Sequence, residues 1–143
     1  MAGIKTKTIP AENWPEHAEE AAGIVRAGGI ILFPTETVYG IGTHPSATGI
    51  EKLAGMKCRA PGKPFQVLIA DTGTLKEWGA VLCPAAEKLI QAFWPGPLTL
   101  ALEVDTSKTP AGLAPNETIG FRIPDHELCL DLIRRAGGSL AAT

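Results

Sequence analysis

The 143-residue sequence lacks the patterns that mark membrane-spanning, secreted or metal-binding proteins. No apolar run approaches the ~18 residues that a membrane span needs, and the opening segment, MAGIKTKTIP, has no signal-like apolar stretch. The three cysteines form neither a CxxC motif nor a cluster with the three histidines, whose spacing fits no metal site. We therefore predict a soluble, cytoplasmic protein with no membrane contact, disulfide framework or metal-ligating cluster.

A strong charge of either sign is also absent. Thirteen lysines and arginines face fifteen aspartates and glutamates, which gives a formal net charge of −2. That balance argues against a protein that holds nucleic acid by bulk positive charge, although it allows a small anion site. Neither GxGxxG nor GxxxxGK[ST] occurs, so the two common phosphate-binding loops are excluded.

The composition is that of one globular domain. Hydrophobic residues make up 45% and charged residues 20% of the sequence, which is enough apolar surface for a core. The 16 glycines and 12 prolines predict numerous turns. The length is close to that of a single domain.

Strand-like and helix-like segments alternate along the sequence. We predict strands over residues 5–9, 30–33, 65–70 and 118–123, one strand after the WPGPLTL turn, and a last strand from Leu140. We predict helices over residues 13–27, from a cap at Ser46 or Thr48 through Ala54, over 84–93, and from a cap at Asp125 to Ala136. This mixture predicts an α/β domain that is not a doubly wound nucleotide fold.

The first candidate site is the PTETVYG segment. It follows the continuous apolar run 30–33, which is typical of a strand covered on both faces. Ligands of α/β sheets usually bind at strand ends, and the hydroxyls of Thr35 and Thr37 beside Glu36, with Tyr39 nearby, suit a small zwitterion such as an amino acid. The alternative is an ordinary turn whose threonine side chains satisfy backbone groups. Spacing alone leaves both interpretations open.

The second candidate is a basic loop with Lys57, Arg59 and Lys63. No acidic residue of the loop neutralises them. An arginine offers a planar fork for phosphate oxygens and a lysine offers a point charge, so together they could clamp a polyphosphate. A solvated basic turn is the alternative.

The third candidate is Arg122, inside the apolar strand 118–123. Because a strand alternates its faces, Arg122 points away from Phe121 and Ile123 and shares its face with Thr118. This pattern leaves two alternatives, an arginine exposed on an open face or one aimed at an anion in a cleft.

Four motifs, in order, resemble one known family. FPTETVYGIG, K-C-R with a lysine four residues after the arginine, FWPGPLTL and GFRIPDHEL are similar to the threonylcarbamoyl-AMP synthase (YrdC-like) family, from about Ile24 to Thr143. The resemblance implies a twisted mixed sheet with flanking helices and an open cationic cavity. It also implies that L-threonine, bicarbonate and ATP, with Mg²⁺, are joined to threonylcarbamoyl-AMP and pyrophosphate. Downstream transferase proteins would use this product to modify tRNA, which is itself a further candidate partner.

The resemblance also assigns residues to roles. Lys57 and Arg59 match the catalytic Lys-x-Arg signature that holds ATP, and Lys63 and Thr118 match further ATP-binding positions. Thr35, Thr37 and Arg122 match the threonine site, with Arg122 on the threonine carboxylate. No covalent enzyme nucleophile is needed, because positive charge would bring the threonine carbamate to the α-phosphate.

The family continues beyond GGSLAAT with a Ser-x-Asn motif, whereas this sequence stops at Thr143. We therefore expect residues 1–143 to form one YrdC-like domain that is incomplete at its C-terminus and impaired in activity. Two alternatives to the synthase are an RNA-binding module without catalysis and a carbamoyl-transfer domain of the same fold.

Overall fold

The computed structural model describes residues 3–60 and 62–143 of the protein. Its helices are η1 (Ala11–Asn13), α1 (Trp14–Arg26), α2 (Ala47–Met56), α3 (Thr74–Glu77), α4 (Pro84–Phe93), η2 (Thr106–Lys108) and α5 (Glu127–Arg135). Its strands are β1 (Ile31–Phe33), β2 (Gly40–Thr43), β3 (Gln66–Ile69), β4 (Leu100–Glu103), β5 (Thr118–Arg122) and β6 (Ser139–Ala142). None of these described helices combines the length and the apolar character needed to cross a membrane.

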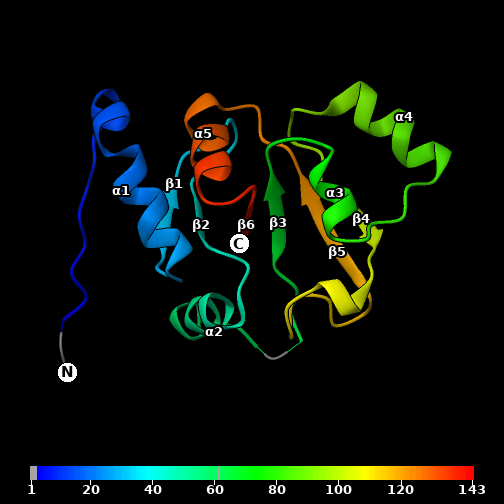
Figure 1. Cartoon of the computed structure of the whole chain (residues 1–143), viewed down its shortest axis with the longest axis horizontal. Helices are drawn as coiled ribbons and strands as arrows, with labels where there is room; N and C mark the ends of the chain where they lie inside the picture. The colour runs from blue at the N-terminus through cyan, green and yellow to red at the C-terminus, as the bar shows by residue number, and fades with distance from the viewer. Residues whose placement is uncertain (1–2, 61) are drawn as a thin grey trace.

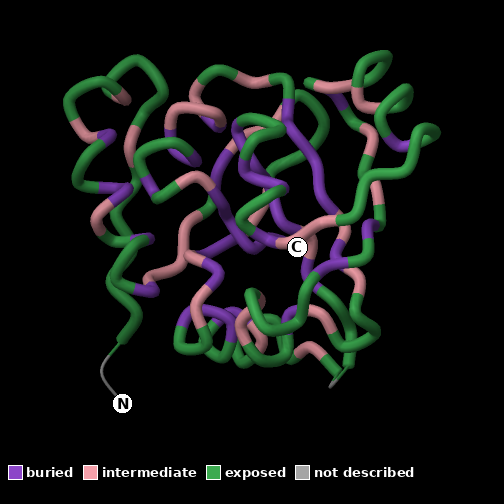
Figure 2. Tube along the Cα trace, turned by 45° about the vertical axis from the view of Figure 1, so that its right-hand side comes forward, coloured by how far each residue is buried: buried purple, intermediate pink, exposed green. Residues whose placement is uncertain are grey.

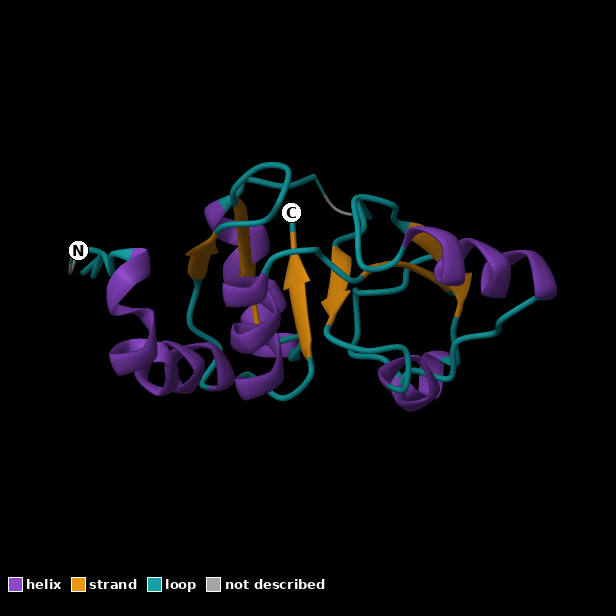
Figure 3. Cartoon of the chain, turned by 90° about the horizontal axis from the view of Figure 1, so that it is seen from above, coloured by secondary structure: helices purple, strands orange, loops and turns teal. Residues whose placement is uncertain are grey.

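The strands form one mixed sheet in the order β1-β2-β6-β3-β5-β4, with helices on both sides of the row (Figures 1 and 3). β3 and β5 run parallel, and the other neighbouring pairs run antiparallel. The last strand, β6, lies between β2 and β3, so the chain ends in the middle of the molecule (Figure 2). This arrangement confirms the predicted α/β class and the mixed sheet.

Two clusters of buried side chains cover opposite faces of the sheet. Alternation along β3 divides its residues between them, because Val67 and Ile69 join one cluster whereas Leu68 and Ala70 join the other. The first cluster includes side chains of α2 and α3, and the second includes side chains of α1 and α5. β6 connects both clusters, since Ala141 belongs to the first and Leu140 to the second.

The predicted helices are confirmed, with one correction at a cap. In α1 the small residues Ala18, Ala21 and Ala22 are buried, and their spacing places them on one face of the helix. The Ser46 hydroxyl accepts the amide N–H of Gly49 at 3.2 Å and caps α2. Asp125, however, is not the cap of α5; His126 occupies that position, and its Nδ1 accepts the amide N–H of Cys129 at 3.4 Å.

The strand predictions need three corrections. Residues 5–9 form no strand and pair with none of the described strands. The segment runs beside α1 (Figure 1). The run 30–33 is not covered on both faces, because β1 is an edge strand and Leu32 is 68% exposed. The end of the PTETVYGIG segment is not loop, because Gly40–Thr43 pairs with β1 and β6 as β2.

Two glycines of α2 give a matched test of packing at the N-terminus of this helix. A Cβ at Gly49 would lie 2.5 Å from the carbonyl oxygen of His44 and 2.6 Å from the hydroxyl of Thr43, whereas a Cβ at Gly55 meets nothing within 4 Å. We expect Gly49→Ala to lower the free energy of unfolding by about 1–3 kcal/mol through overpacking. Gly55→Ala should raise it by about 0.5–1 kcal/mol, because alanine is the better helix former.

Urea denaturation of the two variants and the wild type measures both effects. Equal stability of the two variants would contradict the close approach of α2 to the end of β2.

Candidate active site

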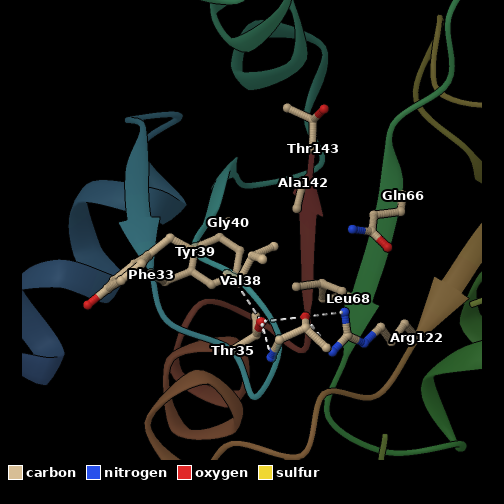
Figure 4. Close-up of a pocket in the computed structure, with 11 residues that line it drawn as sticks. Phe33, Thr35, Val38, Tyr39, Gly40, Gln66, Leu68, Arg122, Ala142 and Thr143 are labelled. Carbon is tan, nitrogen blue, oxygen red and sulfur yellow. Dashed lines mark hydrogen bonds between the residues drawn. The ribbon is translucent and has the colours of Figure 1, made fainter. Parts of the chain in front are cut away.

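A cavity of about 120 Å³ lies at the sheet, beside the segment between β1 and β2 (Figure 4). The residues around it come from β1, β2, β3, β5, β6 and the segment between β1 and β2. They are Phe33, Thr35, Thr37, Val38, Tyr39, Gly40, Gln66, Leu68, Arg122, Ala142 and Thr143. Among these described lining residues, Arg122 alone carries a charge. The PTETVYG segment, which is predicted to suit an amino acid ligand, and Arg122 of β5 therefore lie around the same cavity.

The segment 34–39 is held as a compact turn by the hydroxyl of Thr35. This hydroxyl donates to the carbonyl oxygen of Val38 at 2.6 Å, and it accepts the amide N–H of Thr37 at 3.2 Å. The two threonine hydroxyls lie 3.0 Å apart. Thr35 thus does what the ordinary turn interpretation required, whereas the hydroxyl oxygen of Thr37 also lies 3.4 Å from both Nη atoms of Arg122.

Arg122 is buried and bound on several sides. It is 7% exposed, and its Nε–H donates to the carbonyl oxygen of Gly96 at 3.0 Å. Both Nη atoms lie 3.4 Å from the hydroxyl oxygen of Thr37. One Nη forms an ion pair with Glu36, whose other carboxylate oxygen accepts the amide N–H of Asp125. The strand arginine is therefore aimed at an anion rather than exposed, and the anion is the protein's own carboxylate.

Sequence reasoning placed Glu36 in the loop but missed this pairing. The available signal was the buried arginine itself, because a buried charge needs a partner of opposite sign. The partner could not be read from the spacing, since Arg122 and the loop are about 85 positions apart, as its contact with Thr37 shows.

Burial shifts the pKa of two neighbouring groups. It lowers the pKa of Arg122 and raises the pKa of the Cys129 thiol to about 12, because a site away from water disfavours the charged form of either group. The attraction between the two opposite charges offsets part of each shift. Cys129 lies on α5 and belongs to the cluster of buried side chains beneath that helix.

The basic loop stands beside the cavity, and Arg59 is built into its structure. The guanidinium donates to the carbonyl oxygen of Pro64 at 2.6 Å, to that of Lys63 at 3.4 Å and to the hydroxyl of Thr143 at 2.7 Å. It also lies 4.8 Å from the centre of the Phe65 ring. Since Thr143 lines the cavity, Arg59 connects the basic loop to the rim. Lys57 and Lys63 are exposed, and like Arg59 they are not among the lining residues.

The structure places Thr118 away from the lining of the cavity and adds Gln66 to that lining. Thr118 lies at the opposite end of β5 from Arg122, pairs with Glu103 across the sheet and lines a second hollow of about 270 Å³. Gln66, which the sequence gave no reason to select, lines the cavity and accepts a hydrogen bond from the Thr99 hydroxyl at 3.3 Å. Gln66 lies on β3 and Thr143 directly after β6 (Figure 4).

The family model Sua5_yciO_yrdC, described as telomere recombination, matches residues 23–143. The chain belongs to the Sua5/YciO/YrdC family. A threonylcarbamoyl-AMP synthase of Bacillus subtilis (strain 168) is 39% identical over 135 residues, which are 91% of this chain and 38% of that protein. A threonylcarbamoyl-AMP synthase of Nitrosococcus oceani is 32% identical over 132 residues, with 92% of this chain and 70% of that protein covered.

A solved structure supports the same family membership. The crystal structure of Pyrococcus abyssi Sua5 complexed with L-threonine superposes with a TM-score of 0.84 at 32% identity, over 96% of this chain and 39% of that one. The chain thus spans well under half the length of the B. subtilis and P. abyssi relatives and about 70% of the N. oceani relative. The predicted twisted mixed sheet of the Sua5/YciO/YrdC family is confirmed.

The thiols of this Sua5/YciO/YrdC domain should differ sharply in reactivity. Cys58 and Cys83 are exposed and Cys129 is buried, with its pKa raised to about 12. Because the thiolate is the reactive form, iodoacetamide at about pH 8 should alkylate Cys58 and Cys83 in the folded protein and spare Cys129. Mass spectrometry before and after unfolding in urea measures this. Alkylation of Cys129 at the same rate without urea would contradict the buried site beside Arg122.

Proposed function

We propose that this chain carries the synthase domain that joins L-threonine, bicarbonate and ATP to threonylcarbamoyl-AMP and pyrophosphate. The observation that carries the proposal is the meeting of Thr35, Thr37 and Arg122 in one small cavity, in a family whose curated members bear the synthase name. Proteins that transfer the threonylcarbamoyl group to tRNA would use the product, and tRNA is a candidate partner. The synthase name of these relatives favours this activity over the RNA-binding and carbamoyl-transfer alternatives.

L-Threonine is assigned to the cavity. A volume of about 120 Å³ suits a small amino acid, whereas drug-sized ligands, to which a nucleotide is comparable, occupy pockets of about 300–1,000 Å³. Arg122 supplies the fork that pairs with an α-carboxylate, and the hydroxyls of Thr35 and Thr37 supply polar contacts beside it. P. abyssi Sua5, whose structure was solved with L-threonine, is similar to 96% of this chain.

ATP is assigned to the rim of the cavity. Lys57, Arg59 and Lys63 would hold its phosphates, and the hydrogen bond between Arg59 and Thr143 brings this positive loop next to the threonine cavity. Thr118 belongs to the same proposal, as a contact for a part of the nucleotide that extends along β5. Since the cavity is too small for ATP, the nucleotide lies across its mouth.

The chemistry needs positioning and charge rather than a nucleophile from the enzyme. The lone pair of the neutral threonine amine attacks the carbon of bicarbonate or carbon dioxide and forms a carbamate. With bicarbonate the carbon–hydroxyl bond breaks and the hydroxide leaves as water with one amine proton, whereas with carbon dioxide the amine proton is released to solvent. A carbamate oxygen then attacks the α-phosphorus, and the bond to pyrophosphate breaks. Both partners of this second step are anions, so Lys57 and Arg59 would lower their repulsion and hold them in line.

Mg²⁺ belongs to the proposal only as a companion of ATP. Across residues 3–60 and 62–143, no three histidine, cysteine, aspartate or glutamate side chains gather as a metal site would require. The described residues therefore offer no ready-made set of ligands for a resident metal ion. A magnesium ion bound through phosphate oxygens and water needs few protein ligands, and no step above depends on it.

The threonine assignment is tested by Arg122→Met. The change removes a charge-assisted contact with the substrate carboxylate, which contributes on the order of 1.5–3 kcal/mol, so threonine affinity should fall by at least about tenfold. Isothermal titration calorimetry of folded protein measures it, with the exposed Arg134→Met on α5 as the matched control. Equal affinity of Arg122→Met and wild type would remove Arg122 from the site.

The ATP assignment is tested most cleanly at Lys57, because Arg59 also holds the loop together. Lys57→Ala should weaken ATP binding by about fivefold to tenfold, as expected for one lost charged contact. The control is Lys52→Ala, which removes an exposed lysine from the preceding helix α2. If both variants bind ATP as the wild type does, the phosphates do not lie on this loop.

A further inference from the structure

Each of the three guanidinium nitrogens of Arg122 already has a protein acceptor near it. Its Nε–H bonds to the carbonyl oxygen of Gly96, its Nη atoms approach the Thr37 hydroxyl, and one Nη pairs with Glu36. Because the side chain is also buried, a substrate carboxylate that binds Arg122 competes with these acceptors.

Of these acceptors, Glu36 is the one that can leave. The carbonyl of Gly96 is fixed in a turn, because the N–H of Gly96 donates to the carbonyl oxygen of Ile123 at 2.8 Å. The carboxylate of Glu36 sits at the surface end of the site, with its side chain 21% exposed. Its second contact is the amide of Asp125, an exposed residue whose N–H can bond to water instead.

Charge favours an exchange over the addition of a second carboxylate. A second carboxylate beside Glu36 would bring two like charges together on one guanidinium in a poorly hydrated site, which is costly. One guanidinium with one carboxylate remains neutral. A glutamate carboxylate and the α-carboxylate of an amino acid are the same chemical group, so the second can take the position of the first.

We propose that Glu36 is an internal carboxylate ligand of Arg122 and that the α-carboxylate of the amino acid substrate displaces it. This inference rests on the proposed function. Glu36 then sets both affinity and selectivity, because a ligand without a carboxylate cannot compete for Arg122. Departure of Glu36 also releases the amide of Asp125, which precedes α5, and loosens the loop 34–39.

Glu36→Gln is the decisive variant. Glutamine keeps the shape of the side chain but loses its charge, so it is the weaker competitor for Arg122. Calorimetry should show L-threonine binding about tenfold more tightly to Glu36→Gln than to wild type, the change expected when one charged pair no longer opposes binding. The control is Glu127→Gln, which removes the same charge from an exposed position in the first turn of α5 and should bind threonine as the wild type does.

The outcomes separate this inference from the proposed function. Equal or weaker binding by Glu36→Gln, with binding by wild type, overturns the exchange and makes Glu36 a residue that only positions Arg122. Absence of threonine binding by folded wild type overturns the threonine site itself, and the exchange with it.

A second measurement uses the unaltered protein and does not depend on how the variant folds. If threonine displaces Glu36, the amide of Asp125 loses its acceptor. Its hydrogen exchange, followed by NMR, should then become at least about threefold faster when threonine is saturating. Unchanged or slower exchange at Asp125 in a sample that binds threonine contradicts the displacement.

Discussion

The buried charge of Arg122 is the constraint that brings separate parts of the chain to the same place. A guanidinium away from water needs acceptors on most of its donors, and here they come from the β1–β2 segment and from the turn before β4. Glu36 extends the connection to Asp125, at the start of α5. The end of β5, two loops and the start of a helix are therefore held together by one side chain, which also lines the cavity.

The sheet depends in a similar way on β6. This strand pairs with β2 on one side and β3 on the other, so it joins the β1–β2 hairpin to the β3-β5-β4 group. Its residues are buried on both faces, which explains why they are small or apolar. The hydroxyl of Thr143, directly after β6, accepts from Arg59. Through that bond the basic loop is connected to the central strand, in addition to the bonds that Arg59 makes to the carbonyl oxygens of the loop itself.

Features with local causes could be predicted, and those with distant causes could not. The cap at Ser46 and the apolar face of α1 follow from nearby residues, and both are confirmed. The strand Gly40–Thr43 was missed because its sequence, GIGT, has little strand propensity and is held by its neighbours β1 and β6. The three candidate segments of the site were found from residue type and spacing, whereas the pairing of Arg122 with Glu36 and the anchoring of Arg59 depend on the folded chain.

The two arginines differ in the charge that they leave to a ligand. The acceptors of Arg59 are carbonyl and hydroxyl oxygens, which are neutral, so its positive charge adds to those of Lys57 and Lys63 at the rim. Arg122 is already neutralised by Glu36 inside. A positive rim attracts a polyanion such as ATP, whereas inside, a single guanidinium can exchange its own carboxylate partner for that of an amino acid. The two arginines thereby assign the two proposed substrates to different places, ATP to the rim and threonine to the interior. The threonine amine is free to react where the rim and the interior meet.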